Sequence, residues 1–208
     1  MNADNFWDVI GMYNQQTWKI QLLLMVVIAA SFIVSNRTKK HWLPKVALGI
    51  STSYIGIVFF LVYGTEPIQH FFAAPLFIAT GLLFIWEGFK NKHEKLNPFK
   101  RIHWFLLFLF LLYPVISMLL GNSFPKMVVY IMPCPVICLS IIIYSCYARK
   151  NILVLILLSL WGLTGVKSFF FNAYEDIILL LCGLYCVSIL IAELKNKSRN
   201  IDLQNTVN

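Results

Sequence analysis

Long apolar stretches alternate with short polar connections along the whole chain. An α-helix needs about 17–25 apolar residues to cross a hydrocarbon core of roughly 30 Å. Most of the stretches reach this length, and the sixth is short. Seven helices are predicted, at residues 17–35, 46–64, 70–89, 102–120, 127–147, 152–167 and 174–194. The pattern therefore predicts an all-α fold, a bundle of seven transmembrane helices that forms one domain over residues 17–195.

The two ends of the chain are too polar to cross a membrane. In residues 1–16, Phe6, Ile10 and Tyr13 recur at helical spacing, with Trp7 beside them. This spacing is typical of an amphipathic helix that lies in the membrane surface, so we predict one on the outer side. Residues 196–208 form a short polar segment. We expect this segment to be a disordered cytoplasmic tail.

Basic residues are concentrated in every second connection. Fourteen of the 17 Lys and Arg residues fall in residues 36–45, 90–101, 148–151 and 195–199. Cytoplasmic loops of membrane proteins carry such an excess of positive charge. The distribution predicts that the N-terminus lies outside and the C-terminus lies in the cytoplasm, which requires an odd number of spans.

Composition agrees with a membrane protein and excludes several other classes. Hydrophobic residues make up 59% of the chain and charged residues 12%, whereas a soluble domain has about a quarter charged residues. The net charge of +8 does not indicate nucleic-acid binding, because no basic face with interleaved aromatic residues is present. The expected partner is the lipid bilayer.

Residues that would indicate a cofactor or a metal site are missing from the spans. The four histidines, His41, His70, His93 and His103, fall in loops or at span ends, which argues against a membrane zinc hydrolase. Glycine-rich phosphate-binding motifs are also absent, so we predict no nucleotide cofactor. Glu87 lies near a cytoplasmic span end, where we expect its carboxylate to reach water.

The fifth predicted span contains the most informative local feature, the sequence Pro133-Cys134-Pro135. Proline lacks an N–H and disfavours helical conformation in the residue before it, so two prolines predict a break rather than a kink. We expect a short helix to start at Pro135 with Cys134 at its cap. Free N–H groups and the positive end of the helix dipole would then make Cys134 a ligand or a nucleophile. The alternative is a structural break that contains a small buried thiol.

Three further features accompany the break. Cys138 follows Cys134 at helical spacing, and Cys182 and Cys186 repeat that spacing, but cysteine also packs as a small apolar residue, so we predict no metal site. Glu175-Asp176 opens the seventh span, where acidic residues either stabilise a helix start or bind a cation. Gly162 and Gly165, beside Trp161, indicate a close approach between helices.

These residues also carry a resemblance to a known family. The motifs that carry it are, in chain order, Tyr13-Asn14 with Trp18 and Gln21, Tyr113-Pro114 with Gly121 and Pro125, Pro133-Cys134-Pro135, and Trp161 with Gly165 and Glu175-Asp176. In this order the chain resembles a bacterial inner-membrane family of unknown function. The resemblance implies seven spans and a location in the bacterial cytoplasmic membrane. The chain departs from the family pattern at Val136-Ile137, where threonines are usual. After Pro133-Cys134-Pro135, only Ser140 therefore keeps a hydroxyl group.

Three hypotheses follow for the function. The first is a small-solute or ion transporter, or a ligand-binding membrane protein, with its site at the break. The second is a membrane-embedded enzyme that uses the Cys134 thiol with outer acidic residues or His70. The third is a non-catalytic scaffold or partner subunit, and a homo-oligomer is left open. The candidate binding residues are Tyr13, Asn14, Tyr113, Pro133, Cys134, Pro135, Ser140, Trp161, Glu175 and Asp176.

Overall fold

The protein is helical throughout the part of the chain that is described. The computed structural model describes the backbone of residues 3–171 and 173–207, and the side chains of residues 5–170 and 173–199. Those residues form helices connected by loops and contain no β-strand, which confirms the predicted all-α class. The elements are α1 (Ala3–Thr38), α2 (Leu43–Tyr54), η1 (Ile55–Val62), η2 (Gln69–Ala73), α3 (Ala74–Lys90), α4 (Arg101–Leu111), α5 (Tyr113–Leu119), α6 (Pro133–Ser145), α7 (Ile152–Leu163), η3 (Thr164–Lys167), α8 (Ser168–Phe171), η4 (Tyr174–Asp176) and α9 (Ile177–Val207).

Consecutive elements join into helices long enough to cross a membrane. Five of them in the described part have the necessary length and apolar character: Asn5–Thr38, Leu43–Val62, Gln69–Lys90, Ile152–Phe170 and Tyr174–Arg199. The pair α4 and α5, bent by 44°, makes a sixth if it counts as one span. The stretch predicted as the fifth span is helical only from Pro133 onward, and α6 has 13 residues, about 20 Å of helix.

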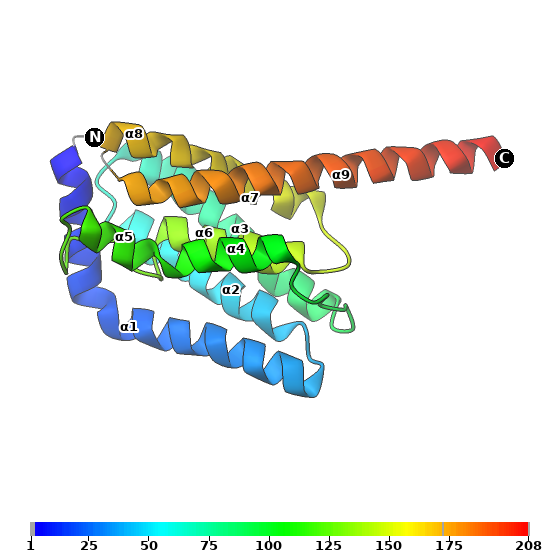
Figure 1. Cartoon of the computed structure of the whole chain (residues 1–208), viewed down its shortest axis with the longest axis horizontal. Coiled ribbons are helices and arrows are strands. Elements are labelled where there is room, and N and C mark those ends of the chain that lie inside the picture. The colour runs from blue at the N-terminus through cyan, green and yellow to red at the C-terminus, as the bar shows by residue number, and fades with distance from the viewer. Residues whose placement is uncertain (1–2, 172, 208) are drawn as a thin grey trace.

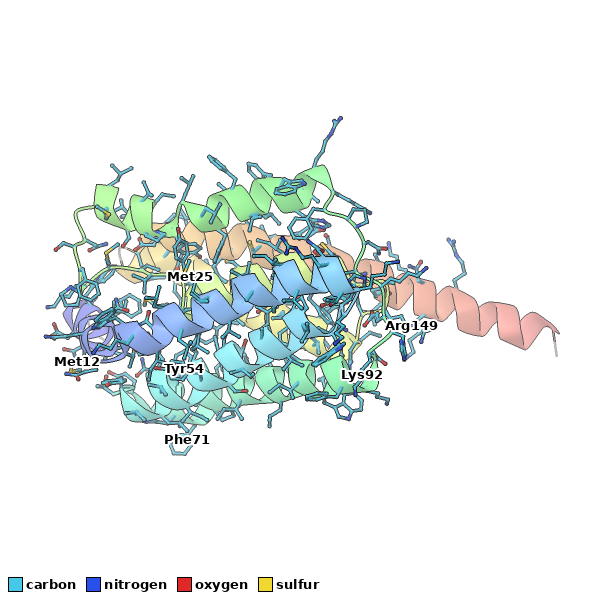
Figure 2. All side chains as sticks on the ribbon, turned by 90° about the horizontal axis from the view of Figure 1, so that it is seen from below. Met12, Met25, Tyr54, Phe71, Lys92 and Arg149 are labelled. Atoms are coloured by element: carbon cyan, nitrogen blue, oxygen red, sulfur yellow. The ribbon has the colours of Figure 1, made fainter. Side chains whose placement is uncertain are left out.

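The helices run side by side along the long axis of the molecule, with the two termini at opposite ends (Figure 1). Lys92 and Arg149, from two of the basic connections, lie at the end opposite to Met12 (Figure 2). These two basic connections therefore lie away from the end that carries Met12.

Both ends of the chain are helical where the structure describes them. Residues 3–16 are part of the continuous helix α1, whose first turns cross the end of the bundle before the helix bends into the long axis (Figure 1). The apolar residues Ile10 and Tyr13 are buried against the rest of the protein. At the other end, α9 continues to Val207, so the backbone of the segment predicted to be a disordered tail is helical as far as it is described.

Helices α7 and α9 pack closely through glycine, as the sequence of the sixth span predicts. A Cβ atom on Gly162 would lie 2.5 Å from the Gly183 Cα, and one on Gly165 would lie 2.5 Å from the Leu180 backbone nitrogen. Only a residue without a side chain allows this distance between two backbones. The contact fixes the end of α7, and with it Trp161, relative to the start of α9.

A buried ionic cluster connects α2 and α3 at the end that carries the basic connections. Lys45 Nζ lies 3.2 Å from Glu87 Oε2 and 2.6 Å from Glu94 Oε2. Tyr144 of α6 donates a hydrogen bond to Glu87, 3.0 Å from Oε2. Glu87 is only 3% exposed. The expectation that its carboxylate reaches water is therefore wrong, because Lys45 and Tyr144 replace the water.

Candidate functional site

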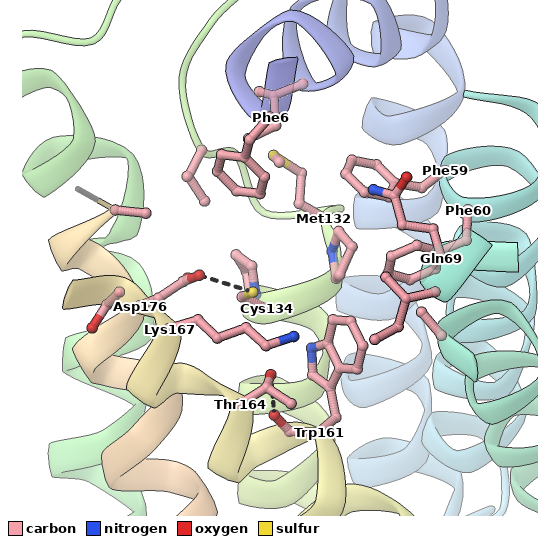
Figure 3. A pocket seen from close by; sticks show the side chains of 18 of the residues that line it. Phe6, Phe59, Phe60, Gln69, Met132, Cys134, Trp161, Thr164, Lys167 and Asp176 are labelled. Carbon is pink, nitrogen blue, oxygen red and sulfur yellow. Dashed lines mark hydrogen bonds between the residues drawn. The ribbon is translucent and has the colours of Figure 1, made fainter. Parts of the chain in front are cut away.

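A cavity of about 320 Å³ lies at the end of the bundle where α6 begins (Figure 3). Apolar and aromatic residues form most of its wall, and a few polar side chains are placed among them. The lining residues are Phe6, Ile10, Phe59, Phe60, Ile68, Gln69, Phe72, Ala73, Val128, Met132, Pro133, Cys134, Pro135, Trp161, Thr164, Lys167, Ser168, Ala173 and Asp176. They come from six regions of the chain, so the cavity exists only in the folded bundle.

The helix break is present, but α6 begins two residues earlier than predicted. Met132 has the extended backbone conformation of a residue before proline, with φ −128° and ψ 164°, and α6 starts at Pro133. Cys134 is therefore the second residue of the helix rather than its cap. Proline tolerates the first turn because N–H groups there have no partner within the helix.

The two prolines also change the character of this helix terminus. Among the first three residues of α6, only Cys134 has an N–H group, and the Val136 N–H already donates to the Met132 carbonyl at 3.0 Å. The expectation of several free N–H groups is thus wrong. Pro133 and Pro135 instead remove donors that would be costly to leave unpaired away from water.

Tyr13 and Asn14 of α1 hold the non-helical segment that leads into the break. The Tyr13 hydroxyl donates to the Ile131 carbonyl at 2.8 Å. The Asn14 amide donates to the carbonyls of Pro125 and Met127, both at 2.8 Å. Both side chains are fully buried behind this segment, and neither lines the cavity. These two predicted binding residues therefore hold the segment before α6 in place and do not contact the cavity.

Cys134 and Asp176 meet at the wall of the cavity, as Figure 3 shows. The Cys134 thiol donates a hydrogen bond to Asp176 Oδ2, with Sγ and Oδ2 3.1 Å apart. The other carboxylate oxygen, Oδ1, is buried and has no hydrogen-bond partner among the described residues. A thiol that donates to a carboxylate keeps its proton, so this arrangement does not provide the activated thiol that a helix N-terminus was expected to produce.

Trp161 presents an indole N–H without a partner at the same cavity. Its ring packs edge-on against Phe60 and Phe77, with centroid distances of 5.3 and 4.7 Å. The Nε1 atom is buried and makes no hydrogen bond of standard geometry with the described residues, and the same is true of Ser168 Oγ. Buried donors are almost always paired in folded proteins. These two atoms are therefore candidate hydrogen-bonding positions of the site.

Lys167 adds a positive charge to the cavity. Its side chain extends across the cavity in the direction of Trp161 (Figure 3). It makes no ion pair with any residue of the described part of the chain. In the sequence, Lys167 is one of the few basic residues outside the basic connections. This exception to the charge pattern is the signal that could have marked Lys167 as a candidate binding residue.

The remaining predicted residues lie outside the cavity. Tyr113 is buried, with its hydroxyl 3.5 Å from Cys138 Sγ. Glu175 points to α5, where its Oε1 accepts a hydrogen bond of 2.9 Å from Ser117. Ser140 is buried in α6 and its hydroxyl has no partner. The structure thus brings together Pro133, Cys134, Pro135, Trp161 and Asp176 of the predicted set.

Sequence reasoning missed part of the wall. Phe59 and Phe60 of η1, and Gln69 of η2, line the cavity from two helices with π-type backbone. Such segments are rare and occur often at functional sites, but no sequence pattern predicts them. Among the described residues that line the cavity, none is a histidine, and His70 is not part of the wall. The described residues contain no group of three or more His, Cys, Asp or Glu side chains suited to a metal ion.

The fold defines the class as a helical protein whose apolar helices are compatible with a membrane location. The sequence profile of a family of unknown function, DUF6064, matches residues 3–200. The chain belongs to this family, and the expected resemblance to a family of unknown function is confirmed to that extent. No curated protein and no solved structure matches the chain.

Proposed function

We propose that this chain is a membrane protein of the transporter type that binds a small solute in the cavity at the Cys134 helix break. The observation that carries the proposal is a cavity of about 320 Å³ whose lining residues include Asp176 and Trp161. Each of these residues has a buried polar atom, Asp176 Oδ1 and Trp161 Nε1, without a hydrogen-bond partner among the described residues. Ligand pockets are typically apolar cavities with a few placed polar groups. Interrupted helices at membrane depth recur where transporters hold their substrates.

The proposal includes a topology. The non-helical segment at residues 120–132 and helix α6 would together make the seventh crossing, in addition to the six apolar helical spans. The N-terminus would lie outside and the C-terminus inside, in the cytoplasmic membrane of a bacterium. The separation of the basic connections from the end that holds the cavity supports this orientation. The cavity would then face the outside.

The thiol-enzyme alternative has less support. Thiol nucleophiles are activated by a neighbouring base or cation that favours the thiolate. Cys134 instead has the Asp176 carboxylate as its hydrogen-bond partner, at 3.1 Å, and a thiolate there would face a like charge. The scaffold alternative predicts that the cavity has no occupant, and labelling of Cys134 tests it.

Cys134 is the thiol that a reagent should reach. It is partly exposed, whereas Cys138, Cys146, Cys182 and Cys186 are buried. We expect a membrane-impermeant maleimide, added outside intact cells, to label the wild-type protein at one site. The Cys134→Ser variant should lose the label and keep its thermal stability. Absence of labelling, together with a stable Cys134→Ser variant, would refute an outward-facing cavity and leave the scaffold alternative.

A further inference from the structure

The cavity contains two opposite charges that do not pair with each other. Asp176 and Lys167 are the two charged residues among its described lining residues. Within the described part of the chain neither residue forms an ion pair, and the Asp176 carboxylate contacts the Cys134 thiol. Asp176 Oδ1 is buried, whereas Lys167 is exposed. A charge removed from water without a partner is costly, so the Asp176 carboxylate favours a cationic ligand group, and Lys167 offers its positive charge to an acidic one.

The Asp176 carboxylate is placed to receive a cationic group. The Cys134 thiol holds Oδ2 at 3.1 Å, which fixes the carboxylate and leaves Oδ1 free. Oδ1 is buried and unpaired, so it is a ready acceptor for an ammonium N–H. The thiol therefore acts as a positioning group for Asp176.

Trp161 and Lys167 favour a ligand group of the opposite charge, an acidic one. An indole N–H can only donate a hydrogen bond, and a lysine ammonium has three donors and no acceptor. Trp161 Nε1 is buried without a partner, and the Lys167 side chain extends toward Trp161 in Figure 3. Together they present donors and a positive charge, which suit a carboxylate or a comparable acidic group.

We infer that the cavity binds a small zwitterion, with its ammonium group on Asp176 and its acidic group at Trp161 and Lys167. This inference rests on the proposed solute-binding function and deepens it. A ligand with a single charge would leave one of the two charged residues uncompensated, whereas a zwitterion pairs with both. The aromatic wall from Phe59, Phe60 and Phe72 suits an apolar body on the ligand. The volume of about 320 Å³ matches a ligand of amino-acid size.

The test uses the purified full-length protein in detergent and isothermal titration calorimetry. The probes are the 20 proteinogenic amino acids and glycine betaine. The tightest binder is then compared with analogues that lack one charge, for phenylalanine the pair 2-phenylethylamine and 3-phenylpropanoate. We expect both analogues to bind at least about tenfold more weakly, since each loses one charged contact. Equal binding of the amine or of the acid would overturn the inference.

Two variants assign the charged groups. Asp176→Asn should remove the preference for the zwitterion over the acid, and Lys167→Gln should remove its preference over the amine. The matched controls are Asp8→Asn and Lys126→Gln, an exposed ion pair of 2.5 Å at the same end of the molecule that lies outside the cavity wall. These controls should bind as the wild type does. Selectivity that is unchanged in both cavity variants would also overturn the inference.

The outcomes separate this inference from the proposed function. If no zwitterion binds but an uncharged or singly charged solute does, and that solute protects Cys134 from the maleimide, the inference fails and the solute-binding function stands. If no solute in either set binds and Cys134 is not labelled, both fail. Binding of a zwitterion that protects Cys134 supports both.

Discussion

At the scale of single residues, Tyr13 and Asn14 show how the protein tolerates a non-helical segment inside an apolar bundle. Three carbonyl groups of that segment accept hydrogen bonds from these two side chains. Gln21 extends the arrangement, with its amide nitrogen 3.2 Å from Asn14 Oδ1. Irregular backbone away from water persists only where such groups are satisfied. The positions of Pro133 and Cys134 thus depend on polar residues of α1.

Replacing Asn14 should loosen the segment before α6. Asn14→Ala removes the donors for the Pro125 and Met127 carbonyls and should cost about 1–3 kcal/mol, because an unpaired buried acceptor carries its full desolvation penalty. The measurement is the thermal unfolding midpoint in detergent, together with the rate of Cys134 labelling, which should change. The control is Gln15→Ala at the exposed neighbouring residue. It should leave the unfolding midpoint and the rate of Cys134 labelling unchanged. An unchanged midpoint for Asn14→Ala would contradict the anchoring role.

At the scale of elements, the pairing of α7 with α9 sets the width of the cavity. The two helices approach through Gly162 and Gly183, directly beside Trp161, and α9 follows Asp176. A larger residue at this contact meets backbone atoms, which cannot move aside as a flexible side chain can. The distance between the two polar walls of the cavity therefore depends on residues that carry no functional group.

Gly183→Ala should destabilise the protein by about 1–3 kcal/mol, the usual cost of overpacking. Its Cβ would lie 2.5 Å from the Gly162 carbonyl carbon, which outweighs the gain of up to about 1 kcal/mol in helix propensity. The matched control is Gly11→Ala, whose Cβ meets only the flexible Lys126 side chain. Thermal unfolding should rank the control at or above the wild type and Gly183→Ala below it. A midpoint of Gly183→Ala above that of the control would show that α7 and α9 can move apart without a loss of stability.

At the scale of the whole molecule, the two ends of the bundle have different chemistry. The cavity occupies the end that carries the N-terminus, and its charged residues Asp176 and Lys167 form no ion pair with a described residue. The opposite end is closed by the cluster of Lys45, Glu87 and Glu94, whose side chains are at most 5% exposed. The two ends thus differ, because Lys45 forms ion pairs with two buried carboxylates at the basic end.

Removing Lys45 should leave two buried carboxylates without their cation. Lys45→Met is expected to cost roughly 3–5 kcal/mol, as for other buried pairs that lose one partner. Adding Glu87→Gln and Glu94→Gln to this variant should restore much of the loss, since the uncompensated charges are then removed. Lys92→Met, at an exposed lysine of the same end, is the control. The measurement is the thermal unfolding midpoint of each variant in detergent. A midpoint of Lys45→Met equal to that of the control would refute a stabilising role for the cluster.

Much of the fold follows from the sequence, because apolar stretches and helical spacing are local properties. The all-α class, the break at Pro133-Cys134-Pro135 and the close approach at Gly162 were all predictable. Half of the predicted site residues line the cavity: Pro133, Cys134, Pro135, Trp161 and Asp176. The start of α6 was misplaced, because two prolines predict a break without deciding which of them begins the helix.

The sequence by itself determined the helical class, the interruption at Pro133-Cys134-Pro135 and which segments are apolar, since these depend on neighbouring residues. Only the tertiary structure decided which side chains meet. Cys134 and Asp176 are 42 positions apart, and Tyr13 and Ile131 are 118 positions apart, so no local pattern relates them. The packing of the helices brings such residues together, and it also leaves Asp176 Oδ1, Trp161 Nε1 and Lys167 at one cavity without protein partners.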